Sequence, residues 1–376
     1  MENAQDPKSF YIARQERVGK LIQAAGLDYL ALNPGPSLVY LTGLHFHLSE
    51  RPTVALFQPD APLILVLPEL EKQKIAELPY VLQAFSYGDN PQTWKEAFRK
   101  AAHAAGLDGK KVGVEPGRMR FLELRLLESA AHQAQLVSAQ EPLTALRMQK
   151  DAGEVAAMRK AVAIAQEAFL ATIPMIKPGV SERQIASELT VHLLRSGSQS
   201  DLPFAPIVST GSNSPNPHAT PSERRVATGD LLVIDWGAAW QGYVSDLTRT
   251  LAIGQIEPEF ERIYQAVLEA NAAGRRAARP GIPAGEVDHA ARKVIDEAGY
   301  GQYFTHRVGH GIGMEGHEEP YMFGENQLIL KPGMAFTIEP GIYLPGRGGV
   351  RIEDNVVITE TGSECLSDLR RELWNV

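Results

Sequence analysis

The sequence predicts two domains, a smaller α/β domain over residues 1–146 and an α+β domain over residues 147–376. Three observations lead to this prediction. The length of 376 residues suits two domains, since single domains have about 150 residues each. Helical and strand-like segments alternate with short connections in the first part. In the second part, long amphipathic segments stand beside pairs of strand-like segments joined by turns.

In the first domain, residues 14–32 predict a helix, a glycine stop at Gly26 and then a short strand. Residues 53–58 and 62–68 have the length and apolar character of strands. Residues 94–115 repeat the order of helix, glycine stop and strand. This order is typical of α/β domains.

In the second domain, two capping pairs mark the starts of helices. Asp151 with Glu154 and Ser181 with Gln184 have the spacing of a capping box. Two further helices are expected at residues 257–279 and 284–299, and strands are expected at 231–239, 243–253, 334–339 and 350–358.

Composition excludes several classes of function. Acidic residues outnumber basic ones by 45 to 37, which argues against a nucleic-acid partner bound through its phosphates. The single cysteine, Cys365, excludes an internal disulfide and a thiolate zinc site. The N-terminus has no apolar signal region, and the densest apolar run, LILVL at 63–67, is far shorter than the roughly 20 residues of a membrane span. We therefore expect a cytoplasmic protein that binds no membrane.

The first predicted hairpin brings two aspartates together. If its turn is centred on Trp240 and Gln241, Asp235 lies directly opposite Asp246 on one face. Like charges in that arrangement destabilise a hairpin, because their Cβ atoms are only about 5 Å apart.

The second predicted hairpin has the same character. Gly346 lies midway between Glu339 and Glu353, inside a turn rich in proline and glycine, so that these glutamates also oppose each other. Two hairpins of similar construction suggest a duplicated half-domain.

Divalent cations would resolve the repulsion among these four carboxylates. Their neighbours are apolar strand residues, and a buried carboxylate must be paired or must bind a metal. Two charges about 4 Å apart repel by roughly 4 kcal/mol at an effective dielectric constant of about 20. Two divalent ions would balance the four negative charges.

Histidines extend this set of possible ligands. His306, His310 and His317 lie within twelve residues of one another, and Gly309 and Gly311 beside His310 allow another backbone to approach closely. Adding imidazole to carboxylates moves the expected metal from Mg²⁺ or Ca²⁺ towards Mn²⁺, Fe²⁺, Co²⁺ or Zn²⁺.

Four motifs resemble those of the pita-bread metallopeptidases, in the branch of Xaa-Pro aminopeptidases and Xaa-Pro dipeptidases (prolidases). They are IDWGAAWQGYVSDLTRT, GHGIGMEGHEEP, FTIEPGIY and GVRIEDNVVIT. The first domain, with SLVYLTGL, resembles the creatinase-like N-terminal domain of the same branch. The resemblance implies a catalytic domain with a duplicated hairpin-plus-helices unit around a curved antiparallel sheet. It also implies a homodimeric exopeptidase that hydrolyses the bond before a proline in the second position of a peptide, by metal-activated water.

Position by position, the resemblance implies two metal ions. Asp235 would bind one ion, Asp246 and Glu353 would bridge both, and His310 and Glu339 would complete the second. Mn²⁺ or Co²⁺ are the expected ions, with Zn²⁺ or Fe²⁺ as alternatives.

The resemblance also implies roles in catalysis. Glu339 would act as general base, and His317 would stabilise the scissile carbonyl or the tetrahedral intermediate. His218 and His306 match histidines that line the substrate site. Arg351 would orient a metal-binding carboxylate, Glu353, two residues along its strand.

One departure from the family pattern concerns substrate length. Prolidases have an arginine that binds the C-terminal carboxylate of the dipeptide, and here Tyr321 stands at that place. This substitution favours longer peptides, unless another arginine such as Arg347 takes over the role. The alternative function is a metal-dependent lyase or hydrolase of a small osmolyte-type molecule on the same scaffold. A non-catalytic binding module would lack ligands, and all five are present.

Overall fold

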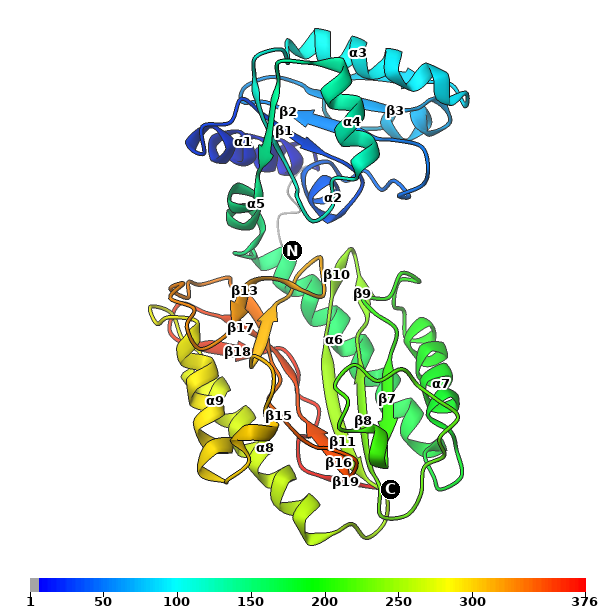
Figure 1. Cartoon of the computed structure of the whole chain (residues 1–376), viewed down its shortest axis with the longest axis vertical. Helices are drawn as coiled ribbons and strands as arrows, with labels where there is room; N and C mark the ends of the chain where they lie inside the picture. The colour runs from blue at the N-terminus through cyan, green and yellow to red at the C-terminus, as the bar shows by residue number, and fades with distance from the viewer. Residues whose placement is uncertain (1–6) are drawn as a thin grey trace. The chain divides into compact units, whose positions relative to one another are not determined.

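The structure is a computed structural model and describes residues 7–376. The chain divides into two compact units, of which the first ends at Arg147 and the second begins at Met148. Figure 1 shows both units with their helices and strands. None of the helices in residues 7–376 combines the length and the apolar character needed to span a bilayer.

The first unit is built on a mixed sheet. Its six strands are β1 (Tyr29–Leu32), β2 (Val54–Phe57), β3 (Leu63–Pro68), β4 (Leu82–Tyr87), β5 (Lys111–Val114) and β6 (Gln135–Ser138). They lie in the order β4-β3-β2-β1-β5-β6. The pairs β1–β5, β5–β6 and β3–β4 are parallel, whereas β2 runs antiparallel to both of its neighbours. The predicted α/β character of this domain is confirmed.

Helices lie on both sides of this sheet. They are α1 (Pro7–Ala24), α2 (Pro36–Thr42), α3 (Trp94–Ala105), α4 (Phe121–Ala130) and α5 (Gln140–Arg147), with 3₁₀ turns at Glu69–Ile75 and Pro91–Thr93. Phe98 of α3 and Leu127 of α4 share a core with Val54 and Val112 of the sheet. Helix α1 contacts α2 and α5 and lies on the opposite side of the sheet (Figure 1).

The second unit combines long helices with hairpins. Its helices are α6 (Ala152–Thr172), α7 (Glu182–Arg195), α8 (Pro258–Ala277) and α9 (Gly285–Glu297), with 3₁₀ turns at Ile173–Met175, Gly211–Asn213 and Gly301–Tyr303. Its strands are β7 (Ile207–Thr210), β8 (Leu231–Trp236), β9 (Ala239–Trp240), β10 (Tyr243–Val244), β11 (Leu247–Ala252), β12 (Gly309–Gly311), β13 (Glu318–Met322), β14 (Ala335–Ile338), β15 (Gly341–Leu344), β16 (Gly348–Arg351), β17 (Asp354–Ile358), β18 (Ser363–Cys365) and β19 (Trp374–Asn375).

These strands form two main sheets. One has the order β19-β11-β8-β7 and the other β13-β12-β14-β17-β18, while β9–β10 and β15–β16 form separate pairs. Every pairing is antiparallel except that of β11 with β19. Helices α6 and α7 share a core with the first sheet, and α8 and α9 share one with the second. Each sheet thus has its own helix pair (Figure 1), as the predicted duplication requires.

Both predicted capping boxes are present. Asp151 Oδ1 accepts the Glu154 amide at 2.9 Å, and Glu154 Oε2 accepts the Asp151 amide at 2.9 Å. Ser181 and Gln184 exchange the same two bonds at the start of α7. These bonds satisfy amide groups that have no partner within the first turn of a helix.

The register of the first hairpin differs from the prediction. Strands β8 and β11 pair Asp235 with Thr248, and β9 and β10 continue this register. The turn is Gln241–Gly242, whose φ angles of 51° and 79° suit a type I′ turn. Asp246 is therefore a diagonal neighbour of Asp235 on the same face. The turn lies one residue later than predicted, so the partner of Asp235 is shifted by two residues and the prediction that these aspartates are directly opposed was wrong.

The register of the second hairpin was predicted correctly. The pairing of β14 with β17 and that of β15 with β16 share one register, and the loop between β15 and β16 is centred on Gly346. Glu339 and Glu353 lie between the two pairings, so they face each other across the hairpin.

A bridge joins the two hairpins. Thr248 of β11 forms an isolated antiparallel bridge with Glu353, whose amide donates to the Thr248 carbonyl at 3.1 Å. Two residues further along each strand, Thr250 Oγ1 donates to the Arg351 carbonyl at 3.0 Å. These contacts bring the acidic residues of the two hairpins into one place.

Candidate metal centre

Five potential ligands converge from five segments of the second unit. Asp235 lies on β8, Asp246 just before β11, His310 on β12, Glu339 just after β14 and Glu353 between β16 and β17. Asp235 and Asp246 form one group with Glu353, and His310 and Glu339 form a second group with Glu353. In each group the ligand atoms lie within 4.8 Å of one another. Glu353 therefore links two potential metal positions.

Burial opposes ionisation of three of these carboxylates. Asp235 is 8% exposed, Asp246 5% and Glu353 1%. Burial raises the pKa of Asp246 and of Glu353 well above the ordinary range, and the negative charges of their neighbours raise it further. Burial also raises the pKa of Asp235, against the opposing effect of Arg351. Without a cation, burial and mutual repulsion therefore oppose three adjacent negative charges at this place.

Glu339 is the most open of the four carboxylates, with 17% of its side chain exposed. Thr337 Oγ1 donates to its Oε1 at 3.3 Å, and its amide donates to the Val308 carbonyl at 2.7 Å. Burial raises the pKa of Glu339 to about 7, while Arg351 lowers it. Glu339 can therefore change its protonation state near neutral pH.

The hydrogen bonds of His310 leave one ring nitrogen available. Nδ1 lies 3.1 Å from the carbonyl oxygen of Gly311, which can only accept, so Nδ1 carries the hydrogen. Nε2 lies 3.3 Å from Glu339 Oε1 and 3.7 Å from Asp246 Oδ2. Burial lowers the pKa of His310 to about 3, and His317 contributes. A neutral Nε2 lone pair that faces carboxylates indicates a shared cation.

Two glycines allow β12 to lie between its neighbouring strands. A Cβ atom on Gly309 would lie 1.9 Å from the Thr337 carbonyl oxygen, and one on Gly311 would lie 2.3 Å from the Glu319 carbonyl carbon. The close approach expected from these glycines is an approach of neighbouring strands, and it fixes the position of His310.

The donor set fits divalent cations. Asp235 Oδ1 is buried and has no hydrogen-bond partner within residues 7–376, whereas its Oδ2 accepts Arg351 Nη2 at 2.6 Å. A buried carboxylate oxygen without a partner is costly unless a cation contacts it. Carboxylate oxygens with one imidazole and no thiolate suit Mn²⁺, Fe²⁺, Co²⁺ and Zn²⁺.

Arg351 acts on two of the carboxylates by different routes. It contacts Asp235 directly, whereas it reaches Glu353 only through Thr248. Arg351 Nε donates to Thr248 Oγ1 at 3.1 Å, and Thr248 Oγ1 donates to Glu353 Oε2 at 2.6 Å. The expected orientation of Glu353 by Arg351 is therefore indirect.

A buried chain of hydrogen bonds leads from Arg351 to His306. Arg351 Nη1 donates to the Tyr343 hydroxyl at 3.1 Å, and this hydroxyl lies 2.9 Å from His306 Nε2. His306 Nδ1 lies 2.7 Å from the Arg307 carbonyl, so Nδ1 donates and Nε2 accepts from Tyr343. Burial lowers the pKa of His306 to about 4. Both ring nitrogens of His306 are thus engaged by the protein.

His317 and His218 are the two exposed histidines among the predicted site residues. The His317 ring stacks on His310 with 3.7 Å between centroids, and His317 groups with His310 and Asp246 as a third possible set of ligands. Burial lowers the pKa of His317, and the charges of Arg307 and His218 lower it further. His218 lies on a loop. The carbonyl of the residue before it, Pro217, accepts a hydrogen bond from Arg351 Nη1 at 3.5 Å.

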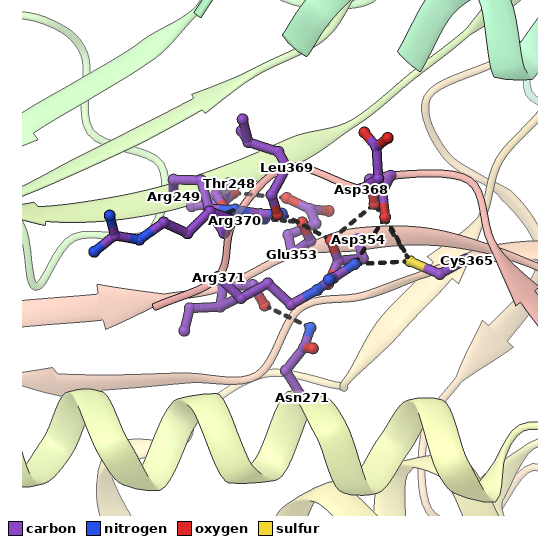
Figure 2. Close-up of polar contacts among 12 residues, drawn as sticks. Thr248, Arg249, Asn271, Glu353, Asp354, Cys365, Asp368, Leu369, Arg370 and Arg371 are labelled. Atoms are coloured by element: carbon purple, nitrogen blue, oxygen red, sulfur yellow. Dashed lines mark hydrogen bonds and ion pairs between the residues drawn. The ribbon is translucent and has the colours of Figure 1, made fainter. Parts of the chain in front are cut away.

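A polar network behind Glu353 has no counterpart in the sequence prediction, and Figure 2 shows it. Arg249 is fully buried. Its Nη1 donates to the carbonyls of Thr248 and Glu353 at 2.8 and 2.7 Å. Its remaining bonds go to Asp354 Oδ1 at 2.9 Å and to the carbonyls of residues 369–370. Arg249 therefore holds the backbone on both sides of the bridge between the hairpins.

Asp354 and Asn355 extend this support to other ligands. Burial would raise the pKa of Asp354, but Arg249 and Arg371 hold it below its ordinary range. Asn355 Oδ1 accepts the Asp246 amide at 3.0 Å, and Asn355 Nδ2 donates to the Asp246 carbonyl at 2.7 Å. Polar residues inside the apolar runs LTRTLA and DNVVI were the available signal for these roles.

A second buried ion pair lies beside His317. Lys150 Nζ and Glu318 Oε1 are 2.6 Å apart, and the Lys150 side chain has no exposed surface. Since Glu318 begins β13, this pair fixes the strand directly after His317. Nothing in the local sequence indicated that Lys150 reaches this place.

Comparison with known proteins places these observations in a family. The model of metallopeptidase family M24 matches residues 156–360, and that of the creatinase/prolidase N-terminal domain matches residues 14–149. The chain is 40% identical over 359 residues to the peptidase YqhT of Bacillus subtilis (strain 168), which covers 95% of this chain and 98% of the relative. It is 35% identical over 363 residues to the Xaa-Pro dipeptidase of Pyrococcus horikoshii, and this match also covers 95% of this chain and 98% of the relative. The crystal structure of dipeptidase PepE from Mycobacterium ulcerans matches with a TM-score of 0.91 at 36% identity, covering 99% of this chain and 100% of that one.

Proposed function

Because the chain belongs to metallopeptidase family M24, we propose that it is an exopeptidase that hydrolyses the Xaa-Pro bond at the N-terminus of peptides. Two divalent cations would be held by Asp235, Asp246, His310, Glu339 and Glu353. The observation that carries this proposal is the convergence of four carboxylates on one neutral imidazole in a buried site. Two divalent cations supply four positive charges against four negative ones.

The metal identity follows from the ligand types. Mn²⁺ or Co²⁺ suit a set of carboxylates with one imidazole, and Zn²⁺ or Fe²⁺ are the alternatives. The bound ions would polarise the scissile carbonyl and lower the pKa of water at the site. Asp235, Asp246 and Glu353 are held in place for this by Arg351, Asn355 and Thr248.

Glu339 is the proposed general base. It has the largest exposed fraction of the four carboxylates, so a substrate water can reach it. A bound cation favours its ionised form, which can take a proton from water and pass it to the leaving nitrogen of proline. Thr337 Oγ1 holds Oε1 in position during both transfers.

The histidines have different proposed roles. His317 is exposed, and its ring nitrogens accept or donate no hydrogen bond within the described part of the chain, so it is free to donate one to the scissile carbonyl. His218 is exposed on its loop, and we assign it to the lining of the substrate site. His306 uses both ring nitrogens within the protein, so we assign it the positioning of Tyr343 and Arg351.

The substrate class is proposed from the relatives together with this site. The relative from Pyrococcus horikoshii is named Xaa-Pro dipeptidase, which supports proline in the second position. The cytoplasmic location and the homodimer stay predictions from the sequence. Light scattering of the purified protein would test the dimer.

An assay with metal-reconstituted protein tests the proposed function. The substrates are Ala-Pro, Ala-Pro-Ala and Ala-Ala, each with Mn²⁺, with Co²⁺ and after exhaustive chelation. We expect cleavage of at least one proline peptide, and cleavage of Ala-Ala that is slower by at least about 10²-fold. Asp246→Asn, which keeps the shape of the side chain, serves as the inactive control. Activity after chelation would contradict the metal mechanism, and equal cleavage of Ala-Ala would contradict the proline specificity.

A further inference from the structure

Arg307 carries a positive charge, and no carboxylate of residues 7–376 lies within ion-pair distance of it, although its charge helps to lower the pKa of Glu339. Its guanidinium carbon lies 4.3 Å from the centre of the Tyr321 ring, a cation–π contact. Within residues 7–376 its side chain forms neither an ion pair nor a hydrogen bond. The residue is half-buried. A guanidinium group in such a place, with its donors unused, is suited to bind an anion.

The register of β12 and β13 places this guanidinium beside the metal centre. Tyr321 pairs directly with His310, so the two side chains project from the same face of the sheet. Arg307, stacked on Tyr321, therefore lies on the face that carries a proposed metal ligand. The positive charge of Arg307 acts on the residues of this face, because it adds to the effect of burial in lowering the pKa of His317.

The other arginines considered for this role are already in use. Arg351 is bound to Asp235 at 2.6 Å. Arg347, at the tip of the second hairpin, forms ion pairs of 2.7 and 2.5 Å with Glu257 and Glu259. Neither can bind a further carboxylate without giving up its present partner.

We propose that Arg307, held on the face of Tyr321, binds the C-terminal carboxylate of a dipeptide substrate and so selects dipeptides over longer peptides. This inference rests on the proposed function. A guanidinium group offers two parallel N–H donors that match a carboxylate. An additional residue would move the terminal carboxylate by roughly 3.5 Å and leave a neutral peptide group at Arg307. The preference for longer peptides that Tyr321 suggested is thereby reversed, because Tyr321 supports the arginine.

The test measures kcat/KM of the metal-loaded enzyme for Ala-Pro, for its C-terminal amide and for Ala-Pro-Ala. The wild-type enzyme should prefer Ala-Pro to the other two by a factor on the order of 10². Arg307→Gln should lose about that factor on Ala-Pro, but at most about threefold on the amide. Arg307→Lys keeps the charge without the paired donors, and should lose about tenfold on Ala-Pro.

The matched control is Arg347→Gln, which removes an exposed arginine of the same unit. It should leave all three kcat/KM values unchanged, and thermal melting should show that every variant is folded. An equal loss on Ala-Pro and on its amide for Arg307→Gln would overturn the proposal. A wild-type preference for Ala-Pro-Ala would overturn it as well.

A binding measurement separates this proposal from the proposed function. Calorimetry compares proline with prolinamide, which lacks the carboxylate, on the metal-loaded wild-type protein and on Arg307→Gln. The wild-type protein should bind proline more tightly, and the variant should bind both alike. If the wild-type protein cleaves none of the three peptides, the proposed function fails, while the calorimetry still decides on Arg307. Equal binding of the two probes by the wild-type protein would overturn the proposal.

Discussion

Replacement of Glu339 by glutamine is expected to make the metal-free protein less sensitive to rising pH. Burial raises the pKa of Glu339 from the ordinary 4.5 to about 7, so the folded chain keeps a proton that the unfolded chain releases. The stability linked to this proton is complete below pH 4.5, and it is lost as the pH rises through about 7. Glutamine does not ionise, so this loss is absent from Glu339→Gln.

The size of the effect follows from the two pKa values. The difference between 4.5 and about 7 is worth about 3.4 kcal/mol, at 1.36 kcal/mol for each pH unit. About 2.5 kcal/mol of this falls between pH 5 and pH 8, because the unfolded chain is already partly ionised at pH 5. The remaining carboxylates of the centre are present in both proteins, so the comparison measures the ionisation of Glu339 together with its charge effect on Glu353.

Urea unfolding in the presence of a chelator, at pH 5 and at pH 8, measures this difference. Tryptophan fluorescence reports mainly on the second unit, since three of the four tryptophans, Trp236, Trp240 and Trp374, lie there. Glu325→Gln, which changes an exposed glutamate of the same unit, is the control and should behave like the wild type. If wild type and Glu339→Gln lose the same free energy of unfolding between the two pH values, the argument from burial is refuted.

Three further predictions concern the centre and its support. The purified protein should contain or require about two divalent ions per chain, measured by elemental analysis; full activity with far fewer ions would contradict the proposed centre. Asp246→Asn or Glu353→Gln should abolish turnover while circular dichroism shows a folded chain, and a variant with the wild-type rate would remove that residue from the metal site. Arg249→Met should lower the free energy of unfolding by about 3–5 kcal/mol, because the buried Asp354 loses its fully buried partner and keeps only arginines that are partly exposed. An unchanged urea midpoint would show that Arg371 alone compensates that charge.

Local patterns predicted the four long helices and the two hairpins of the second unit, but not the strands β7, β12, β13, β18 and β19. The capping pairs fixed the starts of α6 and α7, and Gly346 at the tip gave the register of the second hairpin. The first hairpin was harder, because its strand pattern is compatible with two turn centres. The positive φ angles of Gln241 and Gly242 select the observed turn, and the glycine in that pair was the signal for it.

The support of the centre was not predictable in the same way. Arg249 and Asp354 are 105 residues apart, and Lys150 and Glu318 are 168 residues apart. Periodicity and turn chemistry describe only near neighbours, so they cannot show which buried charge meets which. The place of Arg307 beside the metal centre was not predictable for another reason. Its contact with Tyr321 depends on the register of β12 and β13.

The dependence of Arg249 on the carbonyls of residues 369–370 has a consequence for biosynthesis. Asp235 and Asp246 leave the ribosome more than a hundred residues before residues 369–370, which complete the polar network behind the metal centre. A nascent chain that ends before residues 369–370 cannot form these hydrogen bonds of Arg249, so it should not hydrolyse peptides in its surroundings. Competence for hydrolysis thus arises late in synthesis, after nearly all of the two units has emerged.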